Sequence, residues 1–316
     1  MKKKKLKIGV LFGGKTVEHE VSILSADNVL KGLDKTKYEI LPIKIDKKGN
    51  WNWKKLDEVN LVFPVLHGSF GEEGSVQGLL KLKNIPFVGP DIIGSALGLD
   101  KDVMKRLLRD SGISVVKFVV FRNEDEVSFN KAKKILGLPM FVKPANSGSS
   151  VGIDRVNSQK DFNKAVKVAF QYDTKIIIEE NIIGQELECS VLGNDNPIAS
   201  KVGEIIPKDA FYSYDAKYIS PDGAKLLLSA QIDKKTEKKI QQLSIYTFKT
   251  LECKGMGRVD FFLTKKGKIY VNEINTIPGF TSISMYPKLW EATGLPLNKL
   301  LDRLIELAIE RFDREK

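Results

Sequence analysis

Four polar residues near the end of the chain occur at spacings that could bind a metal ion and a phosphate. Arg258 and Asp260 lie two residues apart, and Glu273 and Asn275 follow with the same spacing. The two pairs are separated by β-prone runs around Lys-Lys-Gly-Lys, a pattern that predicts a β-hairpin. If the turn centres on Lys266-Gly267, Asp260 faces Glu273 and Arg258 faces Asn275.

Side chains alternate between the two faces of a strand, so all four of these residues are expected on one face and within cross-strand contact distance. Two carboxylates and one amide oxygen are a set of hard ligands that Mg²⁺ accepts, and the arginine is available for a phosphate or an oxyanion. A surface hairpin with ordinary charge pairs would show the same residues. The hairpin alone therefore leaves both interpretations open.

A second candidate is the glycine- and serine-rich segment Lys143–Gly152, which follows a predicted strand ending in lysine. Its glycines allow close approach of the backbone, and its N–H groups and hydroxyls could surround a phosphate. It is not a Walker loop, where the lysine follows the glycines. Residues from Gly13 onward do not match Gly-x-Gly-x-x-Gly either, and a flexible connection remains an alternative.

Residues 1–98 alternate strand and helix signals and predict a doubly wound, mainly parallel sheet. In such sheets ligands bind beyond the carboxyl ends of the strands, so the loops at 13–18 and 67–74 should converge there. The expected strands are 7–13, 38–45, 61–66 and 85–88, and the expected helices are 20–33 and 75–83.

Two further units are expected, at 99–184 and 185–316. A loop at about 204–226 is too long for a simple connection and carries aromatic residues and lysine, as a lid over an active site would. The other expected strands are 117–121, 140–143, 175–180 and 187–192, and the expected helices are 101–111, 236–251 and 297–312.

Composition narrows the functional classes. Hydrophobic residues make up 42% of the 316, and no apolar run approaches the roughly 18 residues of a membrane span. The net charge is +11, but five lysines in residues 1–7 leave only +6 for the rest, without a basic face for nucleic acid. Two distant cysteines suit a reducing compartment and argue against a disulfide framework or zinc site. We therefore expect a cytoplasmic protein that binds neither nucleic acid nor membrane.

Several motifs follow one another in a fixed order: Gly13–Ser22, Leu66–Gly68, Gly71–Gly74, Lys143–Gly152, Ile176–Glu186, Tyr214–Tyr218, Gly257–Asp260 and Glu273–Ser284. In this order they resemble the ATP-grasp superfamily, and more specifically the D-alanine–D-alanine ligases over nearly the whole chain. The resemblance implies an α/β fold, α+β in the ATP-grasp part, in which two ATP-grasp domains follow the N-terminal domain and hold ATP between them.

The resemblance implies a role for each residue around ATP. Asp260, Glu273 and Asn275 would hold two Mg²⁺ ions (Mn²⁺ being a possible substitute), and Arg258 and the N–H of Gly279 would stabilise the transferring phosphoryl group and the later oxyanion. The remaining assignments are Lys101, Lys143 and Ser149 at the phosphates, Glu179 with the backbone of Glu180 to Ile182 at adenine, and Glu186 at the ribose.

Around the amino-acid substrates, the resemblance implies that Glu18 binds the ammonium group of the first D-alanine. Ser149 and Tyr218 would complete a hydrogen-bonded set with Glu18, and His67 would lie near the first substrate. Lys217 and Ser284 would hold the carboxylate of the second. If the resemblance is set aside, Glu18 can equally be interpreted as an acidic residue favoured at a helix N-terminus, and Tyr218 as a residue that packs in the loop.

The implied reaction joins two D-alanines with ATP, through an acyl phosphate, for peptidoglycan synthesis. The Lys217–Tyr218 arrangement predicts an amine and not a hydroxy acid as second substrate, and relatives suggest a homodimer. The alternatives are another ATP-grasp carboxylate–amine ligase, a non-catalytic nucleotide-binding protein and a nucleic-acid-binding protein.

Overall fold

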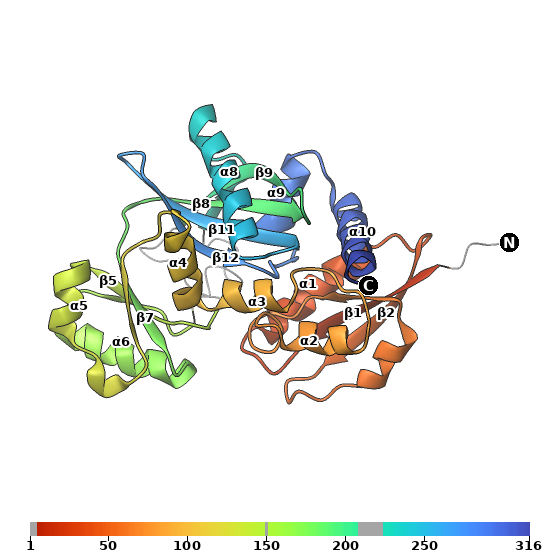
Figure 1. Cartoon of the computed structure of the whole chain (residues 1–316), viewed down its shortest axis with the longest axis horizontal. Helices are drawn as coiled ribbons and strands as arrows, with labels where there is room; N and C mark the ends of the chain where they lie inside the picture. Colours follow the sequence, from red (N-terminus) through yellow and green to blue (C-terminus); the bar gives the residue numbers. More distant parts are fainter. Residues whose placement is uncertain (1–4, 149–150, 208–223) are drawn as a thin grey trace.

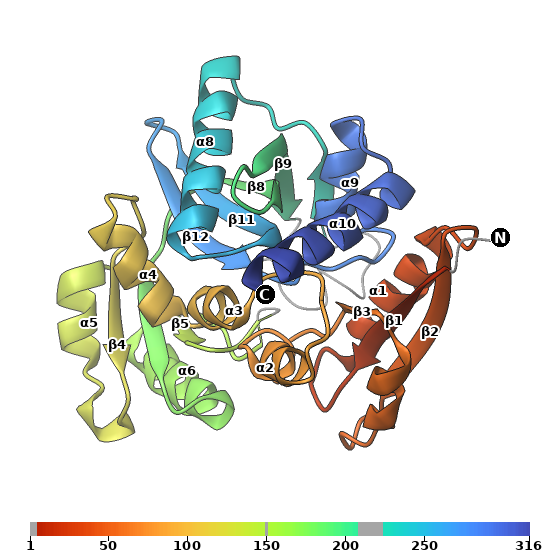
Figure 2. The same cartoon turned by 45° about the vertical axis from the view of Figure 1, so that its right-hand side comes forward.

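The computed structural model describes residues 5–148, 151–207 and 224–316. Its strands form three sheets that follow one another along the sequence, and Figure 2 shows them grouped around helix α3 (Ile92–Leu99). The first sheet is parallel and the other two are antiparallel. The expected combination of α/β and α+β architecture is therefore confirmed.

The N-terminal sheet has strands in the order β2 (Tyr38–Ile45), β1 (Leu6–Gly13) and β3 (Leu61–Pro64). Helices α1 (His19–Gly32) and α10 (Leu297–Glu315) contribute to the core on one face, which contains Ile8 and Val10 of β1. The short helix η1 (Trp53–Glu58) and α2 (Ser75–Leu82) cover the other face. A near-continuous apolar β1 is what a parallel strand covered on both faces requires. The strand expected at 85–88 is instead a single bridge between Val62 and Phe87.

The second sheet has the order β4 (Phe118–Phe121), β7 (Ile176–Glu180), β5 (Met140–Pro144) and β6 (Asp154–Val156). Helices α5 (Phe129–Leu136) and α6 (Gln159–Tyr172) pack against it through a core that includes Phe162 and Ala165. A short turn of helix, η2 (Glu124–Glu126), follows β4. In Figure 2 the two helices lie on the outer side of this sheet.

The third sheet contains the hairpin and has five strands. Helix α4 (Lys101–Asp110) contributes Met104 and Leu108 to its core, and helix α8 (Lys234–Thr250) contributes Phe248. Helix α9 (Met285–Ala292) contacts β9 (Figure 1). The strand order is β10 (Ala224–Leu227), β9 (Ile198–Pro207), β8 (Gly184–Gly193), β11 (Gly255–Thr264) and β12 (Ile269–Asn275).

The long loop expected at 204–226 is shorter than the sequence suggests. Its two ends are strands, because Pro207 of β9 pairs with Ala224 of β10 and Glu204 pairs with Leu227. The residues between them, 208–223, lie outside the described part of the chain, as do Tyr214 and its neighbours in the expected lid.

Candidate active site

The hairpin pairs its four polar residues as expected, although its turn and register differ from those expected. Arg258 pairs with Asn275 and Asp260 with Glu273. The register then shifts, so that Phe261 pairs with Val271 and Asn272 has no opposite residue. The turn is therefore not centred on Lys266-Gly267, and one bulged residue restores the expected pairs at the site.

Three of the four side chains are joined by hydrogen bonds on one face. Arg258 donates from Nε and Nη2 to the two carboxylate oxygens of Asp260, each at 2.8 Å. Asn275 Nδ2 donates to Asp260 Oδ2 at 3.0 Å, and Arg258 Nε also lies 2.9 Å from Glu188 Oε2 on the neighbouring strand β8. The arginine is thus fixed between two carboxylates on β11 and β8.

The oxygen-bearing side chains at this hairpin suit a Mg²⁺ ion that also binds phosphate. They suit less well a metal ion coordinated by protein groups alone. Asp260, Glu273 and Asn275 supply oxygens that Mg²⁺ prefers, and Mg²⁺ usually keeps waters and substrate phosphates as further ligands. Across the ranges that the structure describes, no three His, Cys, Asp or Glu side chains gather as a metal-binding group. Such a site would complete its coordination only with a bound nucleotide.

Of the two lysines expected at the phosphates, Lys101 contacts the glycine-rich loop and Lys143 lies in the strand that leads into it. Lys101, at the start of α4, donates to the carbonyl of Ser147 at 2.8 Å, and its Nζ lies 3.3 Å from Glu273 Oε2. Lys143, in β5, is buried and donates to Glu179 Oε2 at 2.6 Å. The loop, Glu273 and strand β7 are therefore connected through these two lysines.

Glu179 is a buried carboxylate held between two lysines. Lys105 Nζ lies 3.0 Å from Oε1, opposite the contact of Lys143 with Oε2. Burial alone raises the pKa of Glu179, but the positive charges of Lys105 and Lys143 outweigh it and lower the pKa to about 2. The carboxylate stays ionised at neutral pH and can accept a hydrogen bond from a ligand.

The other residues expected around the nucleotide lie next to Glu179. The N–H of Glu180 donates to the carbonyl of Lys117 at 3.0 Å, and the N–H of Lys117 donates to Glu180 Oε1 at 2.7 Å. Burial lowers the pKa of Lys143, but the negative charge of Glu179, with smaller contributions from Glu273 and from Glu186 in β8, outweighs it and raises the pKa. The apolar residues Ile176, Ile177 and Ile178 are fully buried, as core packing also predicts.

Glu18 joins the N-terminal sheet to the glycine-rich loop. It is buried at the N-terminus of α1 without making a side-chain cap there. A Cβ atom on Gly68 would lie 2.7 Å from Glu18 Oε2, and a Cβ on Gly148 would lie 3.3 Å from it. Both loops approach the carboxylate closely because these positions are glycines.

His67 is buried between polar groups of helix α1 and of its own loop. Its Nε2 lies 3.2 Å from Ser25 Oγ, and its Nδ1 lies 3.6 Å from Glu72 Oε1. Burial raises the pKa of Glu72, with help from the negative charge of Glu18 and against the effect of His67. This cluster therefore neighbours Glu18.

Ser284 and Gly279 lie together in the loop between β12 and α9. A Cβ on Gly279 would lie 2.8 Å from Ser284 Oγ, and Ser284 Oγ accepts a hydrogen bond from the N–H of Thr281 at 3.0 Å. Ser284 is the residue that precedes the first turn of α9. A helix N-terminus with a hydroxyl beside it suits a carboxylate.

Ser149, Lys217 and Tyr218 lie outside the described residues, so their expected roles stay predictions. Conversely, four neighbours of the site were not selected from sequence: Ser25, Glu72, Lys105 and Glu188. Glu72 falls in a motif that was recognised, and Glu188 lies two residues after Glu186, on the same face of a strand. Lys105 follows Lys101 by one helical turn, a spacing that could have been noticed.

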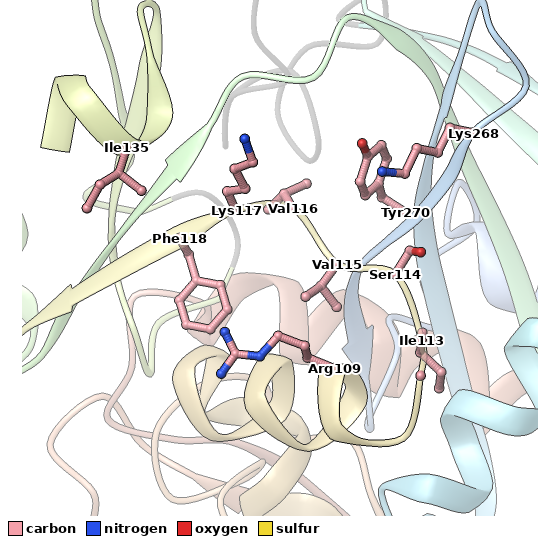
Figure 3. Close-up of a pocket in the computed structure, with 11 residues that line it drawn as sticks. Arg109, Ile113, Ser114, Val115, Val116, Lys117, Phe118, Ile135, Lys268 and Tyr270 are labelled. Atoms are coloured by element: carbon pink, nitrogen blue, oxygen red, sulfur yellow. The ribbon is translucent and has the colours of Figure 1, made fainter.

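A separate groove lies at the linker between α4 and β4. Arg109, Val115 and Phe118 line one side, and Tyr270 of β12 and Lys268, just before that strand, line the other (Figure 3). One of the residues that line it, Lys117, is also hydrogen-bonded to Glu180. The groove therefore borders the end of β7 on its outer side.

Comparisons with known proteins agree with this arrangement. A family model described as "D-ala D-ala ligase C-terminus" matches residues 107–306, and the corresponding N-terminal model matches 7–58 and 52–90. The D-alanine–D-alanine ligase of Oceanobacillus iheyensis is 45% identical over 99% of this chain and 97% of its own length.

Two solved structures share the fold over nearly the whole chain. The VanG D-Ala:D-Ser ligase of Enterococcus faecalis is 38% identical with a TM-score of 0.87, covering 96% of this chain and 100% of its own. The D-alanine–D-alanine ligase of Bacillus anthracis, solved as a complex with ATP, is 30% identical with a TM-score of 0.85 and covers 98% and 100%. Among the described helices, none is both long and apolar enough to cross a bilayer.

Proposed function

The chain belongs to the D-alanine–D-alanine ligase family, and from that premise we infer how its residues divide the work of the reaction. The protein is an ATP-dependent ligase that joins two D-alanines into D-alanyl-D-alanine for the synthesis of cell-wall precursors. The observation that carries the assignment of roles is the meeting of Glu18, the glycine-rich loop and the metal-ligand hairpin at one place.

We propose that the reaction passes through an acyl phosphate. A carboxylate is a poor acylating agent, so one carboxylate oxygen of the first D-alanine attacks the γ-phosphorus and ADP leaves. The amine of the second D-alanine then attacks the carbonyl carbon, loses a proton, and the tetrahedral intermediate expels phosphate. Transfer between two anions needs fixed positive charge around the phosphoryl group.

Arg258 is the group best placed to supply that charge from the protein. Its guanidinium is held by Glu188 and Asp260, so its orientation is set before substrates bind. The N–H of Gly279, in a loop that Ser284 fixes, would support the oxyanion of the tetrahedral intermediate. Lys101 and Lys143 would bind the phosphates.

Asp260, Glu273 and Asn275 would hold Mg²⁺. Bound there, Mg²⁺ would neutralise charge on the β- and γ-phosphates during transfer. Each oxygen of the Asp260 carboxylate has a second lone pair, so Asp260 could bind the metal ion while it keeps its contacts with Arg258.

Adenine would lie at the end of β7, where Glu179 and the backbone of Glu180 to Ile182 offer hydrogen-bonding groups. Glu186 would bind the ribose hydroxyls. A buried, ionised Glu179 suits the exocyclic amino group of adenine, which donates hydrogen bonds. Ser149 would add a hydroxyl at the phosphates.

The first D-alanine would place its ammonium group on Glu18, near His67. The second would place its carboxylate at Ser284 and the N-terminus of α9, with Lys217 as counter-charge. Tyr218, together with Ser149 and Glu18, would complete the set that closes the site. Closure would keep water from the acyl phosphate.

D-serine is a second candidate for the attacking amine, because a D-Ala:D-Ser ligase is 38% identical to this chain over 96% of its length. Offering D-alanine, D-serine and D-lactate in competition, with ATP and Mg²⁺, separates the possibilities by product. We expect the dipeptide D-alanyl-D-alanine to dominate. Preferential formation of D-alanyl-D-serine, or of a depsipeptide at neutral pH, would reject D-alanine as the second substrate.

We also propose that the enzyme works in the cytoplasm, where ATP is made, and acts as a homodimer. The domains would divide at about residues 98 and 184, with ATP between the second and third. Sedimentation measurements on the purified protein test the dimer.

A further inference from the structure

A fully buried lysine connects two parts of the candidate active site that are far apart in sequence. Lys105 lies in α4, one turn after Lys101, and its side chain is inaccessible to solvent. Its Nζ lies 3.0 Å from Glu179 Oε1 and donates to the backbone carbonyl of Asn272 at 2.7 Å. One ammonium group therefore holds both β7 and β12.

Asn272 is the residue on which the geometry of the metal ligands depends. It is the bulged residue between Val271, which pairs with Phe261, and Glu273, which pairs with Asp260. Without the bulge, the register set by the turn would place Asn272 opposite Asp260, and Glu273 would turn to the other face of the hairpin. The hydrogen bond from Lys105 fixes this carbonyl.

Burying a charged ammonium group costs free energy, so the burial of Lys105 calls for a specific role. Burial lowers the pKa of Lys105, and the charge of Glu179 opposes that effect. An apolar side chain would fill the same space without desolvating an ammonium group. The presence of a lysine here is better explained by its contacts with Glu179 and Asn272 than by a contribution to the stability of the fold.

We propose that Lys105 is a positioning residue that holds in place both the carboxylate expected at adenine and the backbone that aligns the expected metal ligands. By fixing Glu179 it presents the carboxylate expected at adenine, and by fixing Asn272 it keeps Glu273 and Asn275 opposite Asp260 and Arg258. This inference rests on the proposed roles of Glu179 and Glu273. Lys105 itself touches neither substrate nor metal.

The two functions of Lys105 predict two linked defects from one substitution. In Lys105→Met the aliphatic volume is nearly kept, but the bonds to Glu179 and Asn272 are lost. We expect the Kd for ATP to rise about tenfold, the size of one lost hydrogen bond to a charged group. The Mg²⁺ concentration that half-saturates ATP binding should rise by a similar factor.

Isothermal titration calorimetry with ATP at several Mg²⁺ concentrations measures both quantities without any turnover. Leu108→Ala is the matched control, because Leu108 is fully buried on the same helix, in the apolar core. It should lower the melting temperature and leave both constants within about twofold of wild type. Glu179→Gln should weaken ATP binding while leaving the Mg²⁺ midpoint unchanged.

The proposal is overturned if the Mg²⁺ midpoint of Lys105→Met equals that of wild type, or if Leu108→Ala shifts it equally. Should Lys105→Met fail to fold, the same constants measured on Lys105→Gln decide by the same criteria. Failure of the proposed ligase activity is seen separately, as wild-type protein that binds ATP but forms no dipeptide.

Discussion

At the scale of single residues, the charged side chains of the site are already paired in ways that constrain their chemistry. Arg258 is held by Glu188 and Asp260, and Lys101 lies beside Glu273. The orientation of these side chains is therefore set before a ligand binds, and substitutions among them are expected to affect catalysis more than folding.

Arg258→Met is expected to lower kcat by about 100-fold or more, because a fixed positive charge at the transferring phosphoryl group is lost. Steady-state assay of ADP release at saturating substrates measures it. Lys268→Met, on the same hairpin but at the separate groove, is the control and should keep kcat. A kcat for Arg258→Met within threefold of wild type would contradict the assigned role.

Glu273→Gln should lower activity by about two orders of magnitude and raise the Mg²⁺ requirement, since a metal ligand loses its charge. Titration of Mg²⁺ in the ADP-release assay shows both effects. Full activity at the wild-type Mg²⁺ concentration would remove Glu273 from the metal site.

Glu179 should make stability depend on acid pH. Its pKa in the folded protein is lowered from 4.5 to about 2, so its ionised form stabilises the fold above about pH 4.5. That contribution is lost as pH falls from 4.5 toward 2. The free energy of unfolding, measured by urea at several pH values, should therefore differ most between wild type and Glu179→Gln near neutral pH. A difference that does not shrink in acid would be inconsistent with this pKa.

The two cysteines are free and buried. Burial raises the pKa of Cys189 to about 11 and also raises that of Cys253, so neither is a thiolate at neutral pH. Neither should react with a thiol reagent in the native protein at pH 8, and both should react in denaturant. Rapid labelling of folded protein, followed by mass spectrometry, would refute the burial.

At the scale of elements, helix α1 supports the loop that carries Gly279 and Ser284. Ser25 Oγ accepts a hydrogen bond from the N–H of Phe280 at 3.2 Å and lies beside His67, and Asn28 Nδ2 donates to the carbonyl of Phe280 at 2.8 Å. One helix thus positions groups expected at both amino-acid subsites.

Ser25→Ala should therefore raise the KM for D-alanine several-fold and lower kcat, while the KM for ATP stays unchanged. The physical reason is that the Ser25 hydroxyl, which contacts both the N–H of Phe280 and the His67 ring, is lost. Steady-state kinetics with each substrate varied in turn provide the test. Equal changes in both KM values would point to a general loss of structure instead.

The sequence predicts an element well where the pattern lies within a few neighbouring residues, and poorly where distant contacts decide the structure. The pairs at Asp260 and Arg258 could be predicted from alternation, but the bulge at Asn272 could not, since the turn residues favour another register. Strand β9 was missed because it was assigned in part to the long loop. The helix at 92–99 is short and follows no strong periodic signal, although Asp91 caps it.

At the scale of the whole molecule, the last helix completes the first core. Leu300, Leu304 and Ala308 of α10 pack with Ile8 and Val29 of the N-terminal part. Lys37 Nζ and Tyr38 Oη also donate to Asp302, at 2.7 and 2.9 Å. No local pattern in the sequence predicts this pairing, because it joins segments separated by more than two hundred residues.

Leu304→Ala should destabilise the protein by about 2–5 kcal/mol, since it opens a cavity in that shared core. Chemical denaturation followed by circular dichroism measures the change. An equivalent truncation at the exposed Leu82 should have little effect. If Leu304→Ala were as stable as Leu82→Ala, α10 would not be part of the N-terminal core.

The central claim is that one active site activates the carboxylate of D-alanine as an acyl phosphate, and isotope transfer tests it most directly. D-Alanine labelled with ¹⁸O in its carboxylate is incubated with ATP, Mg²⁺ and the purified protein, and the released phosphate is examined by mass spectrometry. We predict one ¹⁸O atom in phosphate for each D-alanyl-D-alanine formed. Dipeptide accompanied by unlabelled phosphate would contradict the account.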